Sequence, residues 1–284
     1  MLTESVKNLT DFSQAIAEYR HRWARRWDKD FVWVPWFRGE ESTKFERPLR
    51  PKLYRSSAQL ADLLYEEQEL RLEFRRRGTP LVAERQPAGR LEHWEWYFLM
   101  QHYGVPTRLL DWTDGALVGL YFALKNRGNQ GDQYEGDDAG VYMLDPWWLN
   151  ERAFKEVRKK KKKRPTGVAL PNWREARQYL MKDEFDSDLL KPIIPLAVDP
   201  SHLSRRFAAQ RSRFTIFGKK KAGLRSLINE PRSRIVKFIV KESAISDMQR
   251  SLNTLGISES TVFPDLDGLG RELKLAFDAR QPSK

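Results

Sequence analysis

The sequence contains no cysteine. This absence excludes disulfide bonds, zinc–thiolate sites, iron–sulfur clusters and cysteine nucleophiles. The GxxxxGK[ST], GxGxxG, HExxH and GxSxG motifs are missing too, so nothing points to the nucleotide-binding and hydrolase classes that carry them. The four histidines lie far apart, without the spacing of metal ligands, and we expect no metal site.

Long apolar runs are also missing. No run approaches the roughly 20 apolar residues that span a bilayer, and the first residues lack the hydrophobic segment of a secretory signal. We therefore expect a soluble, cytoplasmic protein without a membrane partner.

Positive charge is abundant by contrast. The 284 residues carry 51 Lys and Arg against 39 Asp and Glu, a formal net charge of +12. This balance favours an anionic partner, such as nucleic acid, a nucleotide or an acidic protein. A solvated basic surface is the simpler alternative.

Hydrophobic periodicity predicts helices that alternate with short strands. Helices are predicted over 9–27, 57–77, 91–103, 116–125, 244–255 and 269–277. Apolar, β-branched segments predict strands over 31–37, 140–145, 193–198, 214–217 and 234–240, and the segment 104–112 predicts a turn and a short strand. Gly78 is expected to end the second helix. This order predicts a single mixed α+β domain.

Two regions differ in character from that domain. Residues 1–29 are expected to form an N-terminal helical extension, which leaves 30–284 as the main catalytic or binding domain. A basic loop insertion is expected near 151–190, because its seven consecutive cations, 158–164, repel one another.

The first candidate site is the Trp36-Phe37-Arg38-Gly39 segment. An arginine at the end of a buried strand can grip a phosphate or carboxylate with two hydrogen bonds. An ordinary ion pair at the strand end is the alternative.

The second candidate site is the polar segment 101–114. His102 is suited to acid–base chemistry or to ligand binding, although a structural role is the commoner one for a single histidine. Arg108 and Asp111 either serve a site or pair with each other, and Thr113 either lines a site or caps the next helix.

The third candidate site is the arginine-rich segment 205–215, whose arginines alternate with phenylalanine and glutamine. This pattern fits nucleic acid, with arginine on phosphate and aromatic rings on bases; a cationic helix end is the alternative. The expected nucleic-acid contacts are Lys159, Lys160, Lys161, Lys162, Lys163, Arg205, Arg206, Arg211, Arg213, Lys219, Lys220 and Lys221.

Four segments carry a resemblance to a known family. They are Phe37-Arg38-Gly39, Gln101 to Thr113, Ala209-Gln210 with Phe214-Thr215, and Phe263 to Leu269. They resemble the FRG domain family, which is named for its Phe-Arg-Gly motif, and the likeness covers nearly the whole chain. Family members often have a glycine after the glutamine motif, where this chain has Arg211-Ser212-Arg213.

A weaker resemblance links the chain to the ADP-ribosyltransferases. It implies a central, partly split β-sheet flanked by helices, in which an arginine holds NAD, a Ser/Thr segment shapes the nicotinamide pocket and an aromatic ring stacks. By order along the chain, the matching positions are Arg38, Thr113, Tyr121 and Gln210. No Glu-x-Glu or Gln-x-Glu lies near Gln210, and Asp111 is a substitute for the missing carboxylate.

The resemblance implies an NAD-dependent ADP-ribosyltransferase-like toxin or defence effector that modifies nucleic acid, RNA more than DNA, with an antitoxin or regulatory protein as a further partner. A non-catalytic nucleic-acid or nucleotide-binding module and a protein-interaction domain are the alternatives. The implied catalytic residues are Arg38, His102, Asp111 and Gln210. The implied NAD-binding residues are Arg38, Gly39, Tyr103, Thr107, Arg108, Thr113, Tyr121 and Phe214.

Overall fold

A computed structural model gives the fold. It describes residues 2–24, 33–46, 48–83, 91–127, 132–157, 174–180, 190, 192–200, 204–278 and 280. The predicted lysine contacts Lys159–Lys163 and most of the predicted 151–190 insertion lie outside these residues. No helix of the described part of the chain is long and apolar enough to cross a membrane.

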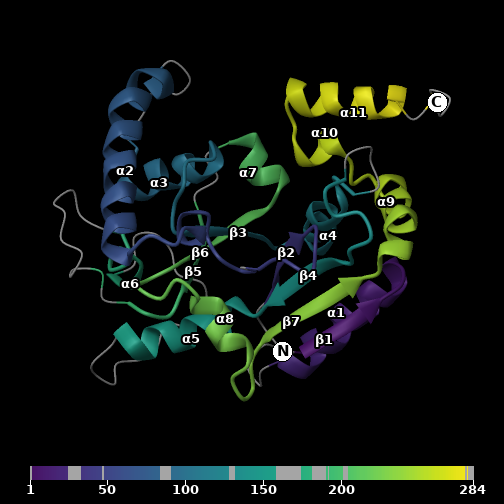
Figure 1. Ribbon diagram of the computed structural model, residues 1–284, viewed down its shortest axis with the longest axis horizontal. Coiled ribbons are helices and arrows are strands. Elements are labelled where there is room, and N and C mark those ends of the chain that lie inside the picture. The colour runs from purple at the N-terminus through teal and green to yellow at the C-terminus, as the bar shows by residue number, and fades with distance from the viewer. Residues whose placement is uncertain are drawn as a thin grey trace.

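A seven-stranded mixed sheet forms the centre of the molecule, which confirms the predicted α+β class (Figure 1). Its order is β1 (Leu2–Val6), β7 (Ile235–Val240), β4 (Ala139–Leu144), β2 (Trp36–Glu40), β3 (Leu109–Thr113), β6 (Ser212–Ile216) and β5 (Leu196–Val198). The pair β1–β7 is parallel, and the other neighbours are antiparallel.

The sheet opens at its middle. Strand β2 pairs with β4 from Trp36 to Glu40, but its register with β3 is confined to Phe37 opposite Thr113. Strand β3 pairs with β6 instead, along its whole length. The two halves of the sheet therefore diverge between β2 and β3, as the prediction of a partly split sheet requires.

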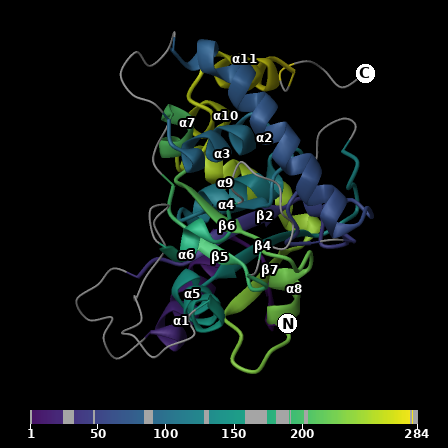
Figure 2. The same ribbon diagram turned by 90° about the vertical axis from the view of Figure 1, so that its left-hand side faces the viewer.

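Helices cover both faces of the sheet (Figures 1 and 2). They are α1 (Leu9–Trp23), α2 (Leu60–Ala83), α3 (His93–His102), α4 (Ala116–Leu124), α5 (Pro146–Val157), α6 (Arg174–Arg177), α7 (Arg205–Ala209), α8 (Gly223–Ile228), α9 (Ile245–Thr254), α10 (Glu259–Val262) and α11 (Leu266–Asp278), with short 3-10 turns η1 (Leu53–Arg55) and η3 (Glu242–Ala244). Figure 2 shows α3, α7 and α10 together above the sheet, and α5 and α8 below it.

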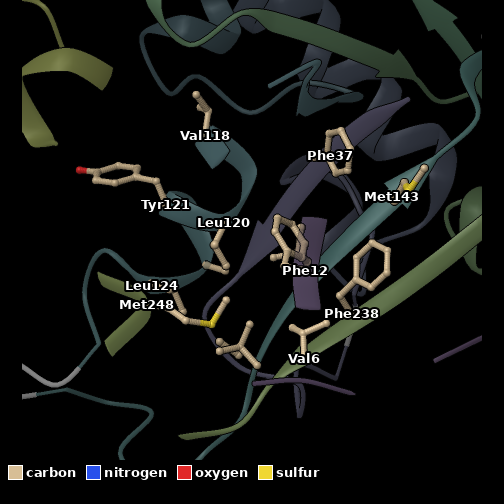
Figure 3. Close-up of a cluster of buried hydrophobic side chains, with 14 of the residues drawn as sticks. Val6, Phe12, Phe37, Val118, Leu120, Tyr121, Leu124, Met143, Phe238 and Met248 are labelled. Atoms are coloured by element: carbon tan, nitrogen blue, oxygen red, sulfur yellow. The ribbon is translucent and has the colours of Figure 1, made fainter. Parts of the chain in front are cut away.

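One hydrophobic cluster joins the N-terminal segment to the sheet (Figure 3). Val6 from β1 and Phe12 from α1 pack with Phe238 of β7, whose ring meets that of Phe12 edge-on at 5.4 Å between centroids. Strand β1 was not predicted, because its LTESV sequence has little apolar content. Residues 2–23 thus share a core with the rest of the chain.

Helix α4 packs directly on β2 because glycine stands at the contact. A Cβ on Gly39 would overlap the backbone of Gly119 and Ala123, and a Cβ on Gly119 would lie 2.7 Å from Cβ of Phe37. This close approach explains the glycine of the Phe-Arg-Gly segment: it fixes the strand against a buried helix, as the apolar sequence of 116–125 predicts.

Several element boundaries differ from the predictions. The strand predicted over 31–37 begins only at Trp36 among the described residues; Trp33 lies before it, where its ring packs on Trp23 and its Nε1 donates to Asp145. Helix α2 does not end at Gly78 but continues to Ala83. Gly78 instead makes room for Trp96, since a Cβ there would lie 3.0 Å from that ring.

Candidate functional site

A cavity of about 880 Å³ lies where β2 and β3 diverge. Its described walls come from β2 and the loop after it, η1, the end of α3, β3, α4, α7 and β6. Elements far apart in the sequence therefore meet there. The predicted site residues that line it are Arg38, Gly39, His102, Asp111, Thr113, Arg206, Gln210 and Phe214.

The Arg38 side chain projects from β2 and is hydrogen-bonded to the neighbouring strand β3. Its Nη1 donates to the backbone oxygen of Asp111 at 2.9 Å. Its Nε lies 3.5 Å from Glu40 Oε1 and is a buried donor without a hydrogen-bond partner in the described part of the chain. The guanidinium is thus anchored to β3 through Nη1, while its Nε makes no hydrogen bond with the described residues.

Glu40 is a cavity residue that the sequence analysis missed. Its side chain is 5% exposed, and Oε1 accepts the Leu49 N–H at 3.2 Å. Oε2 is buried and has no partner among the residues described. The sequence did offer one indication of Glu40. Side chains two residues apart on a strand lie on the same face, so Glu40 is expected beside Arg38.

Asp111 lines the cavity at the end of a hydrogen-bond chain. Gln101 Nε2 donates to its Oδ2 at 2.7 Å, and Thr107 Oγ1 donates to Gln101 Oε1 at 2.6 Å. The side chain is exposed at the cavity surface, yet desolvation by the surrounding protein raises the pKa of the Asp111 carboxyl, while the Arg38 guanidinium opposes this rise. Thr107 was predicted to bind NAD, but it is buried and contacts Gln101 rather than lining the cavity.

His102 closes one wall of the cavity at the end of α3. Its ring stacks on Phe207, with 5.0 Å between centroids and 22° between planes. Burial lowers the pKa of His102 below 6.5, and the positive charge of Arg206 lowers it further. The imidazole is therefore neutral at pH 7 and able to accept a proton.

Helix α7 and its C-cap residue Gln210 supply two polar atoms to the wall beside His102. The Ser204 hydroxyl caps the helix by accepting from the Phe207 N–H at 3.3 Å. Arg206 lies over the Phe263 ring at 4.6 Å, and its Nε has no hydrogen-bond partner in the described chain. Gln210 Nε2 is buried and equally unpartnered.

The two arginines that follow, Arg211 and Arg213, form ion pairs within the protein. Arg211 and Arg213 both pair with Asp114, the latter at 2.7 Å, and Arg213 also lies 3.2 Å from Asp199. Arg211 adopts a φ of 50°, in the left-handed region where glycine is favoured. The pairs tie the loop before β6 to the turn after β3, so these two predicted nucleic-acid contacts are partly neutralised.

Arg108 is a core residue. Its side chain is fully buried, and Nε pairs with Glu67 Oε2 at 2.6 Å. The guanidinium also donates to the backbone oxygens of Phe217 at 3.0 Å and Tyr179 at 2.8 Å. Each of the three guanidinium nitrogens thus donates to a core partner, the ionic partner is Glu67 rather than Asp111, and Arg108 is not among the residues that line the cavity.

Two predicted aromatic residues lie away from the cavity walls. The Tyr121 hydroxyl donates to Glu259, which links α4 to α10 at the edge of the hydrophobic cluster in Figure 3. Tyr103 is 59% exposed and packs against His102 and Phe74. Phe214, stacked on Phe98 with 5.2 Å between centroids, lines the cavity instead.

Charges of both signs line the cavity. The described lining includes the basic residues Arg38, Arg55, Lys125 and Arg206, and the acidic residues Glu40, Glu41, Glu46 and Asp111. Burial and the nearby Arg38 lower the pKa of Arg55. Such a lining fits a ligand that carries both anionic groups and hydroxyl or cationic groups. Among the described residues, no group of His, Asp and Glu is arranged to hold a metal ion.

Comparison with known protein families gives one match, which covers part of the chain. Searches of curated proteins and of solved structures found no match. Residues 34–132 match the sequence profile of the FRG domain family. This range includes Arg38, Glu40, His102 and Asp111, whereas Arg206 and Gln210 lie beyond it. This matched segment supplies β2, α3, β3 and α4 to the cavity.

Proposed function

We propose that the cavity binds NAD and that the protein transfers the ADP-ribose group from NAD to an acceptor. One observation carries the proposal: four buried polar atoms of cavity residues lack hydrogen-bond partners in the described chain. They are Arg38 Nε, Glu40 Oε2, Arg206 Nε and Gln210 Nε2. Each such atom costs about 1–3 kcal/mol when buried unpaired, so a group of four is typical of a site that a polar ligand completes.

The chemistry of these groups suits a dinucleotide. Arginines bind diphosphates through charge-assisted hydrogen bonds, and Arg38 and Arg206 lie on different walls of the cavity. Glu40 Oε2 can accept from a ribose hydroxyl, and the Gln210 amide can donate to a ring oxygen or carbonyl. A volume of about 880 Å³ lies within the range of small-molecule sites.

Transfer of ADP-ribose breaks the bond between C1′ of the ribose and the nicotinamide nitrogen. The bonding electrons leave with nicotinamide, C1′ gains positive charge, and an acceptor oxygen or nitrogen bonds to C1′ and loses its proton. A fixed carboxylate stabilises the positive charge, and we assign this role to Asp111. The neutral imidazole of His102 can take the proton. Thr113 and Phe214 contribute walls around the reacting end.

For the acceptor we propose nucleic acid, RNA before DNA. The net charge of +12 and the exposed side chains of Arg205 and Lys220 support this choice. Modification of RNA would make the protein a toxin or defence effector, which an antitoxin or regulatory protein would restrain.

Labelled NAD tests the proposal. The purified protein is incubated with labelled NAD and RNA, DNA or protein, and label transfer is compared with that of Arg38→Ala. Arg250→Ala is the matched control, because Arg250 is an exposed arginine on α9 that pairs with Asp247. We expect transfer by the wild type and the control but not by Arg38→Ala. NAD binding without transfer would indicate a nucleotide-binding module instead, and no binding would refute the proposal.

A further inference from the structure

We infer that Thr107 and Gln101 are positioning residues, which hold the Asp111 carboxylate in place at the cavity. The role of Asp111 in the reaction rests on the proposed function, but the hydrogen-bond chain that orients it stands on the geometry alone.

The chain begins at the backbone. The Leu109 N–H donates to Thr107 Oγ1 at 3.0 Å. The hydroxyl therefore accepts from β3 and has its own proton left to donate. The nearest acceptor is Gln101 Oε1, at 2.6 Å. In this contact the carbonyl end of the Gln101 amide faces Thr107.

The other end of the amide must then face Asp111. Gln101 Nε2 lies 2.7 Å from Asp111 Oδ2. An ionised carboxylate only accepts hydrogen bonds, so it requires the NH₂ end of the amide. The requirements at the two ends agree, and a flipped amide would set two acceptors against each other at Asp111.

Backbone hydrogen bonds hold the segments that carry Gln101 and Thr107. Gly104 has a φ of 77°, and it ends α3 in a turn in which the Val105 N–H donates to the Met100 oxygen at 2.9 Å. The turn brings Thr107 back beside Gln101. Below it, the Arg108 backbone N–H donates to Glu67 Oε1 at 2.8 Å, so the strand start is bound to α2.

Cations surround the carboxylate that this hydrogen-bond chain holds. The Asp111 backbone oxygen accepts from Arg38, so its side chain and the arginine share one anchor point. The charged or titratable groups around Asp111 are Arg38 from β2, Arg55 from η1, His102 from α3 and Arg206 from α7. Free rotation of the carboxylate would let it turn toward Arg38, Arg55 or Arg206 and away from a ligand.

The test measures the Asp111 carboxyl directly. Its pKa is followed by NMR titration in the full chain for the wild type, Thr107→Val, Thr107→Ser, Gln101→Met and the Thr107→Val/Gln101→Met double variant. Losing a hydrogen bond to the ionised form raises a carboxyl pKa. We expect a rise in Thr107→Val and in Gln101→Met, and a value near the wild type in Thr107→Ser, which keeps the hydroxyl.

The double variant distinguishes positioning from general loosening. If Thr107 acts through Gln101, Thr107→Val adds little to the rise that Gln101→Met causes. An unchanged Asp111 pKa in Gln101→Met, or independent rises that add in the double variant, would overturn the inference. Gln101→Met also keeps the test valid if Thr107→Val fails to fold.

Activity provides the second readout. Where the wild type releases nicotinamide from NAD, we expect kcat to fall about tenfold in Gln101→Met, as for a lost hydrogen bond to a charged group. We expect a fall of no more than that in Thr107→Val, with KM little changed and Thr107→Ser restoring the rate. A wild type without activity would refute the proposed function, and the titration would still decide the inference. A raised KM with unchanged kcat would contradict positioning.

Discussion

Replacement of Arg108 by methionine tests whether this arginine belongs to the core or to the ligand site. The variant removes the guanidinium but keeps much of the side-chain volume. It leaves the Glu67 carboxylate, which is 4% exposed, without its cation. Tyr97, whose hydroxyl also bonds to Glu67, remains as a neutral partner.

The magnitude follows from the burial of both partners. Removing one member of a buried ion pair costs about 3–5 kcal/mol, because the remaining charge is uncompensated. Domains are stable by about 5–15 kcal/mol in total, so this loss is a large share. With an m-value of about 3 kcal/mol/M in urea, the midpoint falls by about 1–1.7 M.

Urea denaturation followed by tryptophan fluorescence measures this change. Arg108→Met/Glu67→Leu is the matched double variant, and it should recover part of the loss, because no buried charge remains. NAD affinity of the folded Arg108→Met protein should stay near that of the wild type. A loss below about 1 kcal/mol, together with a large drop in NAD affinity, would refute the core assignment and restore Arg108 as a ligand residue.

Three further predictions concern the neighbouring structure. Gly39→Ala should destabilise the protein by about 1–3 kcal/mol or prevent folding, because its Cβ meets the backbone of α4; a thermal midpoint equal to the wild type would contradict this. The His102 pKa should rise in Arg206→Met, since a nearby cation and burial hold it down; NMR titration measures it, and an unchanged value would be contrary evidence. His102 binds protons more readily in the unfolded protein than in the folded one. Its titration therefore makes the free energy of unfolding rise with pH between the lowered pKa of the folded state and 6.5. Asp114→Asn should strengthen RNA binding and steepen its salt dependence, because Arg211 and Arg213 lose their shared partner; binding that is equal to the wild type at every salt concentration would exclude these arginines as phosphate contacts.

Local sequence signals predicted much of the fold. The apolar helix 116–125 and the strand 234–240 were placed nearly as observed, because each has a strong and uniform pattern. The helix end predicted at Gly78 was wrong, because glycine occurs at close packing contacts as well as at helix ends, and here it makes room for Trp96. Strand β1 escaped detection because its pairing with β7, more than two hundred residues away, determines its structure.

The candidate site was predicted in part, because some of its residues lie in local motifs and others depend on contacts between distant segments. Arg38, His102 and Asp111 belong to recognisable segments, and all three line one cavity. Arg108 stands in the same segment, but its side chain is directed inward by Glu67, forty-one positions away, which no local pattern reveals. Glu40 lacked a motif of its own, and its importance appears only with its unpartnered oxygen.

Nicotinamide release is the most direct measurement of the central claim. The purified protein is mixed with NAD, free nicotinamide is followed by chromatography, and Asp111→Asn is compared with the wild type after calorimetry has shown that both bind NAD. The account predicts steady release by the wild type and at least about 100-fold slower release by Asp111→Asn, since a lost electrostatic stabiliser costs about 10²–10³ in rate. Release at equal rates by both proteins, or none by a wild type that binds NAD, would contradict it.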